Sequence, residues 1–227
     1  MLVKGLLTQM SGSLGGITAS HNRGGMYLRA RTVPTDPGSL PQLAVRALVA
    51  QLAGLWGSTL TAAQRAAWDT YAANVSVVNR LGDTVFLTGF QHYVRSNVPR
   101  LQASQPRVDD GPTIFDLGDY TAPTLTIAGG GSTLSIAFAV TDEWVDEDDA
   151  ILGVWASREK ASTINFFKGP YRFAGSIVGS STLPPTSPAS ITSPFPYATG
   201  NRGFMQVRVS RADGRLSAFT RTFALAS

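Results

Sequence analysis

The chain has 227 residues, enough for one large or two small domains, and 43% of them are hydrophobic, so it can bury a sizeable core. Only 15% of the residues are charged, which is less than the roughly 25% of an ordinary globular protein, and we expect part of the surface to contact partners. Cysteine is absent, which excludes disulfides, thiol chemistry and cysteine-ligated zinc.

The charge is divided unevenly along the chain. Residues 1–107 carry ten Lys and Arg against three Asp and Glu, whereas residues 108–227 carry nine against twelve. The basic residues are mostly single arginines, unlike the dense clusters of nucleic-acid-binding tails, so nucleic acid is not the expected partner. No apolar run approaches the roughly 20 residues that span a bilayer, and the first residues lack the features of a signal peptide. We therefore expect a soluble, unexported chain without a membrane span.

Residues 1–38 are predicted to form an extended β-ribbon arm. Paired glycines bracket two short runs, residues 17–20 and 26–33, and residues 22–25 have the composition of the turn between them. A lone two-stranded ribbon is marginally stable in water, so this one needs another surface to lie against. Its arginines and Tyr27 could contact nucleic acid through phosphates and stacking, but insertion against a neighbouring protein subunit is the favoured interpretation.

Residues 39–104 are predicted to form a small helical domain. A first helix over residues 41–56 has apolar residues at intervals of three and four, and two further helices follow. A short strand is expected at residues 84–87, between the second helix and the third. The expected N-terminal caps are Ser39, Thr61 with Gln64 in a capping box, and Thr88.

Five motifs stand out between Ser11 and Leu101. They are SGSLGG, SHNRGGMYLRARTVPTDP, QLAVRA, LTAAQRAAWDTYA and NRLGDTVFLTGFQHYVRSN. Together they resemble the N-terminal part of small, mostly uncharacterised proteins encoded among the virion-structure genes of tailed bacteriophages and prophages. None of the five is a catalytic motif, so the resemblance implies a part in virion assembly and assigns no reaction.

Residues 105–121, rich in Pro, Asp and Gly, are predicted to be a linker to an all-β domain over residues 122–227. The run at residues 151–156 is apolar on both faces, so we expect a central strand with Trp155 as the anchor of the core. At least five strands separated by turns favour a β-sandwich. They are expected at residues 122–128, 132–140, 151–156, 204–210 and 216–225, the last two joined by an Asp213–Gly214 hairpin turn.

The terminal stretch RGFMQVRVSRADGRLSAFTRTFALA and the expected core tryptophan are similar to those of fibronectin type III and related immunoglobulin-like domains. The resemblance implies an immunoglobulin-like β-sandwich over residues 122–227. Residues 179–200 depart from a minimal domain of this kind, because their five prolines exclude a central strand. We interpret them as a long loop, which is usually a binding element or disordered. The predicted fold class is thus α+β: an N-terminal β-ribbon arm, a small helical platform and a C-terminal sandwich.

Six carboxylates lie between residues 142 and 149. Calcium prefers such oxygen ligands, but the segment lacks the ligand spacing and the internal glycine of an EF-hand loop. A solvated loop between strands, or a patch for a basic partner surface, is the favoured interpretation, and calcium binding is the alternative. No metal and no cofactor is assigned from the sequence.

The sequence gives little support for catalysis. His21 and His92 are the only histidines, and neither has a GxSxG motif or an acidic neighbour in sequence with which to form a hydrolase triad. The glycine-rich segments SGSLGG and GGG do not continue into the GK[ST] of a phosphate-binding loop. We assign no catalytic residue and expect that the chain is not an enzyme.

The arm and the bacteriophage resemblance together predict a non-enzymatic structural component of a tailed-bacteriophage virion, in the head decoration, neck or tail. It would assemble in several symmetric copies through its N-terminal arm, with other virion proteins and copies of itself as partners. The alternative is a host-surface glycan- or protein-binding module carried by the sandwich. The candidate interface residues are His21, Arg23, Tyr27, Arg29 and Arg31 in the arm and Phe195 and Tyr197 in the sandwich.

Overall fold

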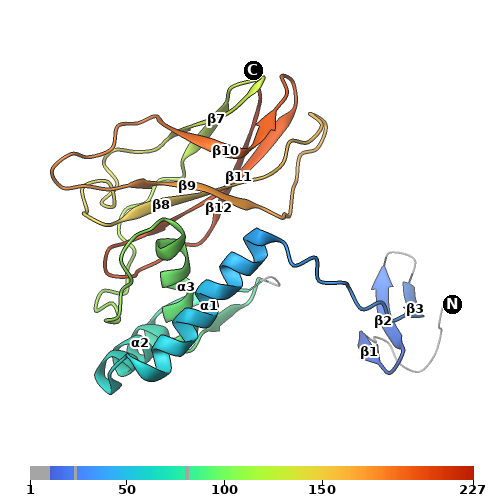
Figure 1. Ribbon diagram of the computed structural model, residues 1–227, viewed down its shortest axis with the longest axis horizontal. Coiled ribbons are helices and arrows are strands. Elements are labelled where there is room, and N and C mark those ends of the chain that lie inside the picture. Colours follow the sequence, from blue (N-terminus) through green and yellow to red (C-terminus); the bar gives the residue numbers. More distant parts are fainter. Residues whose placement is uncertain (1–10, 23–24, 80–81) are drawn as a thin grey trace. The chain divides into compact units, whose positions relative to one another are not determined.

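A computed structural model describes residues 11–22, 25–79 and 82–227 (Figure 1). The chain separates into two compact units, Met1–Ser39 and Leu40–Ser227. The described residues form three helices and twelve strands, and the strands of every sheet pair antiparallel. The predicted mixed α+β class is confirmed.

The first unit contains a small sheet, which we call the N-terminal sheet. Its strands, in the spatial order β1-β2-β3, are β1 (Gly12–Leu14), β2 (Ile17–Asn22) and β3 (Gly25–Ala30). The sequence predicted only β2 and β3, because β1 is three residues long and has no alternating pattern. Gly15 allows the tight turn between β1 and β2, since its φ of +57° favours glycine. Arg23 and Gly24, in the predicted turn between β2 and β3, lie outside the described residues.

The second unit begins with three helices, α1 (Leu40–Ser58), α2 (Ala62–Asn74) and α3 (Gly89–Gln102). Both predicted capping residues of the later helices are confirmed: Thr61 caps α2 and Thr88 caps α3, each in a capping box with the glutamine three residues on. A hairpin of β4 (Ser76–Val78) and β5 (Thr84–Phe86) joins α2 to α3. Within the described chain, no single helix is long and apolar enough to cross a membrane, although α1 and α2, bent by 119° at their junction, meet that test of length and composition as a pair.

The helices enclose an aromatic core of their own. Trp68 and Tyr93 are fully buried, and their rings meet nearly edge to face with centroids 5.7 Å apart. Leu52, from α1, is the buried residue of that helix. Val108 also packs against this core, although it lies beyond the last helix.

Residues 105–121 contain no helix or strand, yet polar contacts fix them at both ends. Near the start, the Trp68 indole donates to the carbonyl of Asp109 over 2.9 Å. Asn97 pairs with the backbone of Val108, since its amide donates to the carbonyl and its Oδ1 accepts from the N–H. Near the end, the Arg211 guanidinium donates to the carbonyl of Leu117 over 2.7 Å. The segment therefore attaches the helices to the strands instead of separating two free domains.

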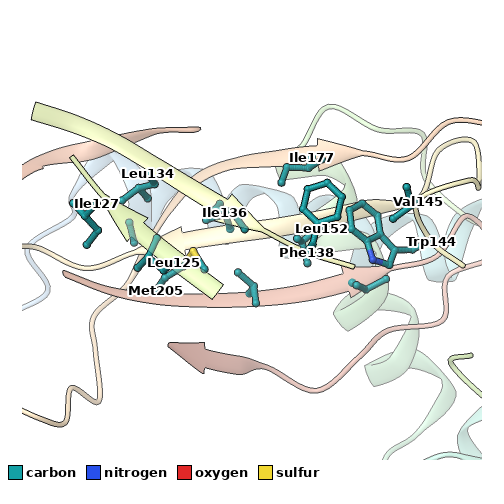
Figure 2. Close-up of a cluster of buried hydrophobic side chains, with 14 of the residues drawn as sticks. Leu125, Ile127, Leu134, Ile136, Phe138, Trp144, Val145, Leu152, Ile177 and Met205 are labelled. Carbon is teal, nitrogen blue, oxygen red and sulfur yellow. The ribbon is translucent and has the colours of Figure 1, made fainter. Parts of the chain in front are cut away.

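Seven strands follow and form two sheets (Figure 1). The three-stranded sheet has the order β10-β7-β6 and the four-stranded sheet the order β12-β11-β8-β9. The core between them contains residues from both sheets, and Figure 2 shows Ile127 and Leu134 from the first with Leu152 and Met205 from the second. The bounds are β6 (Thr124–Ile127), β7 (Gly131–Ala137), β8 (Ile151–Ala156), β9 (Arg172–Val178), β10 (Ala189–Tyr197), β11 (Arg202–Ser210) and β12 (Thr220–Leu225).

The prediction that Trp155 anchors the core was wrong. β8 is an interior strand as expected, but its alternation puts Leu152 and Val154 in the core and Trp155 on the opposite face. There the half-buried Trp155 ring packs against Phe173 and Phe219, each with a centroid distance of 5.4 Å. The tryptophan in the core is Trp144, which is 1% exposed and comes from the acidic segment (Figure 2).

The interpretation of residues 179–200 as a loop was also wrong in part. β10 occupies residues 189–197, and it lies at the edge of its sheet, which is the place where proline is tolerated in a strand. Pro194 and Pro196 face outward and are exposed, whereas Phe195 and Tyr197 between and after them are buried. The five prolines thus excluded a central strand, as predicted, but not an edge strand.

Candidate functional site

The N-terminal sheet has one apolar face and one polar face, which follow from its register. Leu14 pairs with Ile17, Ile17 with Ala30, and Ala19 with Leu28, and paired residues share a face. The apolar face comprises Leu14, Ile17, Ala19, Met26, Leu28 and Ala30, together with His21. The polar face comprises Ser13, Thr18, Ser20, Tyr27 and Arg29.

The apolar face of this sheet is not buried. Among the described residues of β1, β2 and β3, no side chain falls in the buried class, and Leu14 and Ile17 are 89% and 51% exposed. Met26 and Leu28 are only half-buried. Exposed apolar clusters rimmed by polar residues are typical of surfaces that bind partners.

The structure divides the predicted arm residues between the two faces. Tyr27 and Arg29 lie on the polar face, whereas His21 lies opposite Met26 on the apolar face. Arg31 follows β3, and its backbone N–H donates to the carbonyl of Gly16 over 2.8 Å. Arg23 lies outside the described residues. The described candidates therefore do not form one basic surface, which argues against nucleic acid as the occupant of the apolar face.

As candidate interface residues, Phe195 and Tyr197 would have to be exposed, and the structure shows that they are not. They are 8% and 1% exposed, because both face inward from β10. The Tyr197 hydroxyl donates to the carbonyl of Ser157 over 2.7 Å and accepts from Ser193, and burial raises the pKa of this hydroxyl. Tyr197 is thus a residue of the core between the two sheets.

Phe195 has a second environment that the sequence did not predict, a cavity of about 220 Å³. It lies where the connection between β8 and β9 passes β10, and it is lined by Arg158, Lys160, Phe167, Gly169, Pro170, Arg172 and Phe195. We call it the cationic cavity. A signal was present in the sequence: residues 158–172 hold four basic residues and one acidic residue, within a half of the chain whose net charge is negative.

Four of the six carboxylates between residues 142 and 149 form hydrogen bonds or ion pairs with other parts of the chain. Arg211 forms ion pairs with both Glu143 and Glu147, and Asp142 accepts a hydrogen bond from the backbone N–H of Thr121 over 2.9 Å. Asp148 accepts from the backbone and the side chain of Ser181. No group of three or more His, Cys, Asp or Glu residues placed to hold a metal occurs in the part of the chain that the structure describes.

His92 lies on α3, beside Tyr71 of α2. It is 3% exposed, and its ring meets that of Tyr71 edge to face at 5.2 Å. Burial, together with the nearby charge of Arg95, lowers the pKa of its imidazole, and none of the described residues forms a hydrogen bond with its Nε2. This is the environment of a neutral core histidine.

Comparisons of the chain with family models, with curated proteins and with solved structures found no match. Function therefore has to be inferred from the residues of the chain itself. Within the described residues, the two candidate sites are the apolar face of the N-terminal sheet, whose side chains are not buried, and the cationic cavity.

Proposed function

We propose that the chain is a non-enzymatic structural component of a tailed-bacteriophage virion, which assembles in several copies through residues 1–38. The observation that carries this proposal is the apolar face of the N-terminal sheet, on which Leu14 is 89% exposed. The resemblance of the motifs between Ser11 and Leu101 to virion proteins supplies the context. The expected partners are other virion proteins and further copies of the chain.

The energy for such assembly would come from covering the apolar face. Fully burying a leucine or isoleucine side chain contributes about 1.5–3 kcal/mol relative to leaving it exposed. Leu14, Ile17 and Leu28 share this face, so a neighbour that covers it gains several kcal/mol per copy. The edge strands β1 and β3 also offer backbone groups to a strand of a neighbouring subunit.

We further propose that the seven strands β6–β12 form an immunoglobulin-like sandwich of the fibronectin type III kind. Three features support this: two antiparallel sheets of three and four strands, one core between them, and a terminal β11–β12 hairpin. The sandwich would be the part of the chain that projects from the particle or braces a neighbour. Phe195 and Tyr197 are buried, so they give no support to a host-binding surface.

The test is incorporation of tagged chain into particles purified from infected cells. A chain without residues 1–38 is expected to be lost from the particles. Leu28→Asp, which charges the apolar face, is expected to be lost too, whereas the matched variant Thr18→Asp, which charges the polar face, is expected to be retained. Undiminished incorporation of the truncated chain would exclude the anchoring role.

A further inference from the structure

We propose that the cationic cavity is a binding site for the phosphate group of a phosphate monoester. The site lies in the sandwich, so the proposal does not depend on assembly through the N-terminal sheet. It starts from three cationic side chains, Arg158, Lys160 and Arg172, which line one small cavity.

These three cations have no carboxylate partner among the described residues. The ion pairs that the structure describes involve Arg107, Arg211 and Arg215 instead. Glu159, the acid nearest in sequence, accepts hydrogen bonds from the N–H of Ala198 and the amide of Asn201, and it does not line the cavity. The cavity therefore presents positive charge that the fold leaves uncompensated.

Aromatic rings hold the cations in place. The guanidinium carbons of Arg158 and Arg172 lie 5.2 and 5.4 Å from the centroid of the Phe195 ring, which is itself buried. The Lys160 ammonium lies 4.9 Å from the centroid of Phe167. These distances are those of cation–π contacts, which keep the charges close together despite their mutual repulsion. An anion that enters between them relieves this repulsion.

The walls of the cavity are fixed by contacts to β11. Phe167 packs against Phe204 at a centroid distance of 5.6 Å. The backbone of Lys160 exchanges two hydrogen bonds with that of Arg202, of 2.8 and 2.7 Å. The Arg202 guanidinium also donates to the carbonyl of Ile164 over 2.7 Å. The connection that carries two of the three cations is thus ordered before any ligand binds, which lowers the entropic cost of binding.

The three cations that line the cavity favour a phosphate group over other ligands. A phosphate monoester carries a charge of about −1.5 to −2 and three strong acceptor oxygens, which matches two arginine forks and one ammonium. A carboxylate has one charge and two oxygens, and it would leave one cation unpaired. The charges of Arg158 and Arg172 lie over the ring of Phe195, and that of Lys160 lies over Phe167, so the rings already contact cations, which favours an anion over a base or an uncharged sugar. The volume of about 220 Å³ is below the ~300–1,000 Å³ of sites for drug-sized ligands, so the cavity takes the phosphate and leaves the rest of the ester outside.

The test is calorimetric titration of the full chain, in phosphate-free buffer at low salt, with glucose 6-phosphate, inorganic phosphate and glucose. We expect saturable binding of the two phosphates at one site, weakening as salt is added, and no binding of glucose. Arg158→Gln and Arg172→Gln should each weaken binding about tenfold, since each removes a charge-assisted hydrogen-bond donor. Lys168→Gln is the matched control, because Lys168 is an exposed cation of the same connection that does not line the cavity.

A second measurement does not depend on the variants. In NMR spectra of the full chain, phosphate should shift the Nε–Hε signals of Arg158 and Arg172 and leave that of Arg65 in place. The proposal is overturned if neither phosphate binds, or if Lys168→Gln weakens binding as much as Arg158→Gln, which would indicate only a diffuse positive field. It is also overturned if the cavity prefers a synthetic acidic peptide, DEWVDEDD, to glucose 6-phosphate, because the partner would then be a protein.

Discussion

Arg100 is the residue that ties the helices to the strands. It is 1% exposed, and its guanidinium donates to three carbonyls from three segments: Pro106 over 2.8 Å, Asp149 over 3.1 Å and Arg211 over 2.9 Å. Burial lowers the pKa of this guanidinium. A buried charge of this kind is tolerated because these three carbonyls accept from its Nε–H and Nη1–H donors.

The first prediction concerns this residue. Arg100→Met should lower the free energy of unfolding by about 2–4 kcal/mol, because three carbonyls, one of them in a buried hydrogen bond, lose the donor that Arg100 supplies. Urea denaturation followed by circular dichroism measures the change. Arg65→Met is the control, since the one side-chain hydrogen bond described for Arg65 goes to the carbonyl of Trp56 over 3.3 Å. Equal losses in the two variants would show that Arg100 has no special role.

The second prediction is a pH dependence that arises from His92. Its folded-state pKa lies below the ordinary 6.5, so as the pH falls below 6.5 the unfolded chain binds a proton that the folded chain does not yet bind. Stability should therefore be highest above pH 6.5 and fall below it, with a slope of at most about 1.4 kcal/mol per pH unit. His92→Phe keeps a ring beside Tyr71 and should flatten this slope between pH 5 and 6.5. The urea midpoints of both proteins, measured across this pH range, test the prediction. If the variant loses stability with falling pH as steeply as the original chain, groups other than His92 cause the pH dependence.

At the scale of whole elements, the sequence predicted the helix starts that depend on contacts between residues close in sequence. Thr61 and Gln64 are three residues apart, so their capping box depends only on neighbouring residues of the sequence. The helix α2 therefore begins where this capping box predicts. β10 is different, because its prolines are acceptable only at the sheet edge, and the one strand with which it pairs, β7, is distant in sequence.

The cationic cavity was missed for the same reason. Arg158 and Arg172 are fourteen positions apart, and both reach the ring of Phe195 only because β9 of one sheet runs beside β10 of the other. Trp155 was misplaced because a strand that is apolar on both faces does not reveal which face meets the partner sheet. The locations of these residues thus depend on long-range pairing.

The third prediction tests the packing of residues 105–121 against α2. A Cβ on Gly111 would lie 2.5 Å from the backbone of Ala67 and of Trp68, so Gly111→Ala must displace the segment and should destabilise the fold by about 1–3 kcal/mol. Gly54→Ala, on α1, is the matched control. Nothing lies within 4 Å of its added Cβ, and removing a helical glycine should stabilise the fold by about 0.5–1 kcal/mol. Thermal and urea unfolding measure both, and a neutral Gly111→Ala would show that the segment is loosely attached.

At the scale of the molecule, the contacts of Arg100, Asn97 and Arg211 join the helices, residues 105–121 and the strands β6–β12 within Leu40–Ser227. The two buried cores of this unit, around Trp68 and around Trp144, are therefore expected to open together. The N-terminal sheet has no buried side chain among its described residues, so its strand pairing is not supported by a core.

These differences predict two classes of amide in hydrogen exchange on the isolated full chain. Amides of α2 and β8 should share one high opening free energy, that of global unfolding, because the helical and sandwich cores are linked. Amides of β2 should exchange at a much lower free energy, since no described side chain of β1, β2 or β3 is buried and Ile17 is 51% exposed. Mass spectrometry of exchanged peptides separates the three segments. If β2 proved as protected as β8 in a monomer, the N-terminal sheet would need no neighbour, and assembly through it would lose its physical basis.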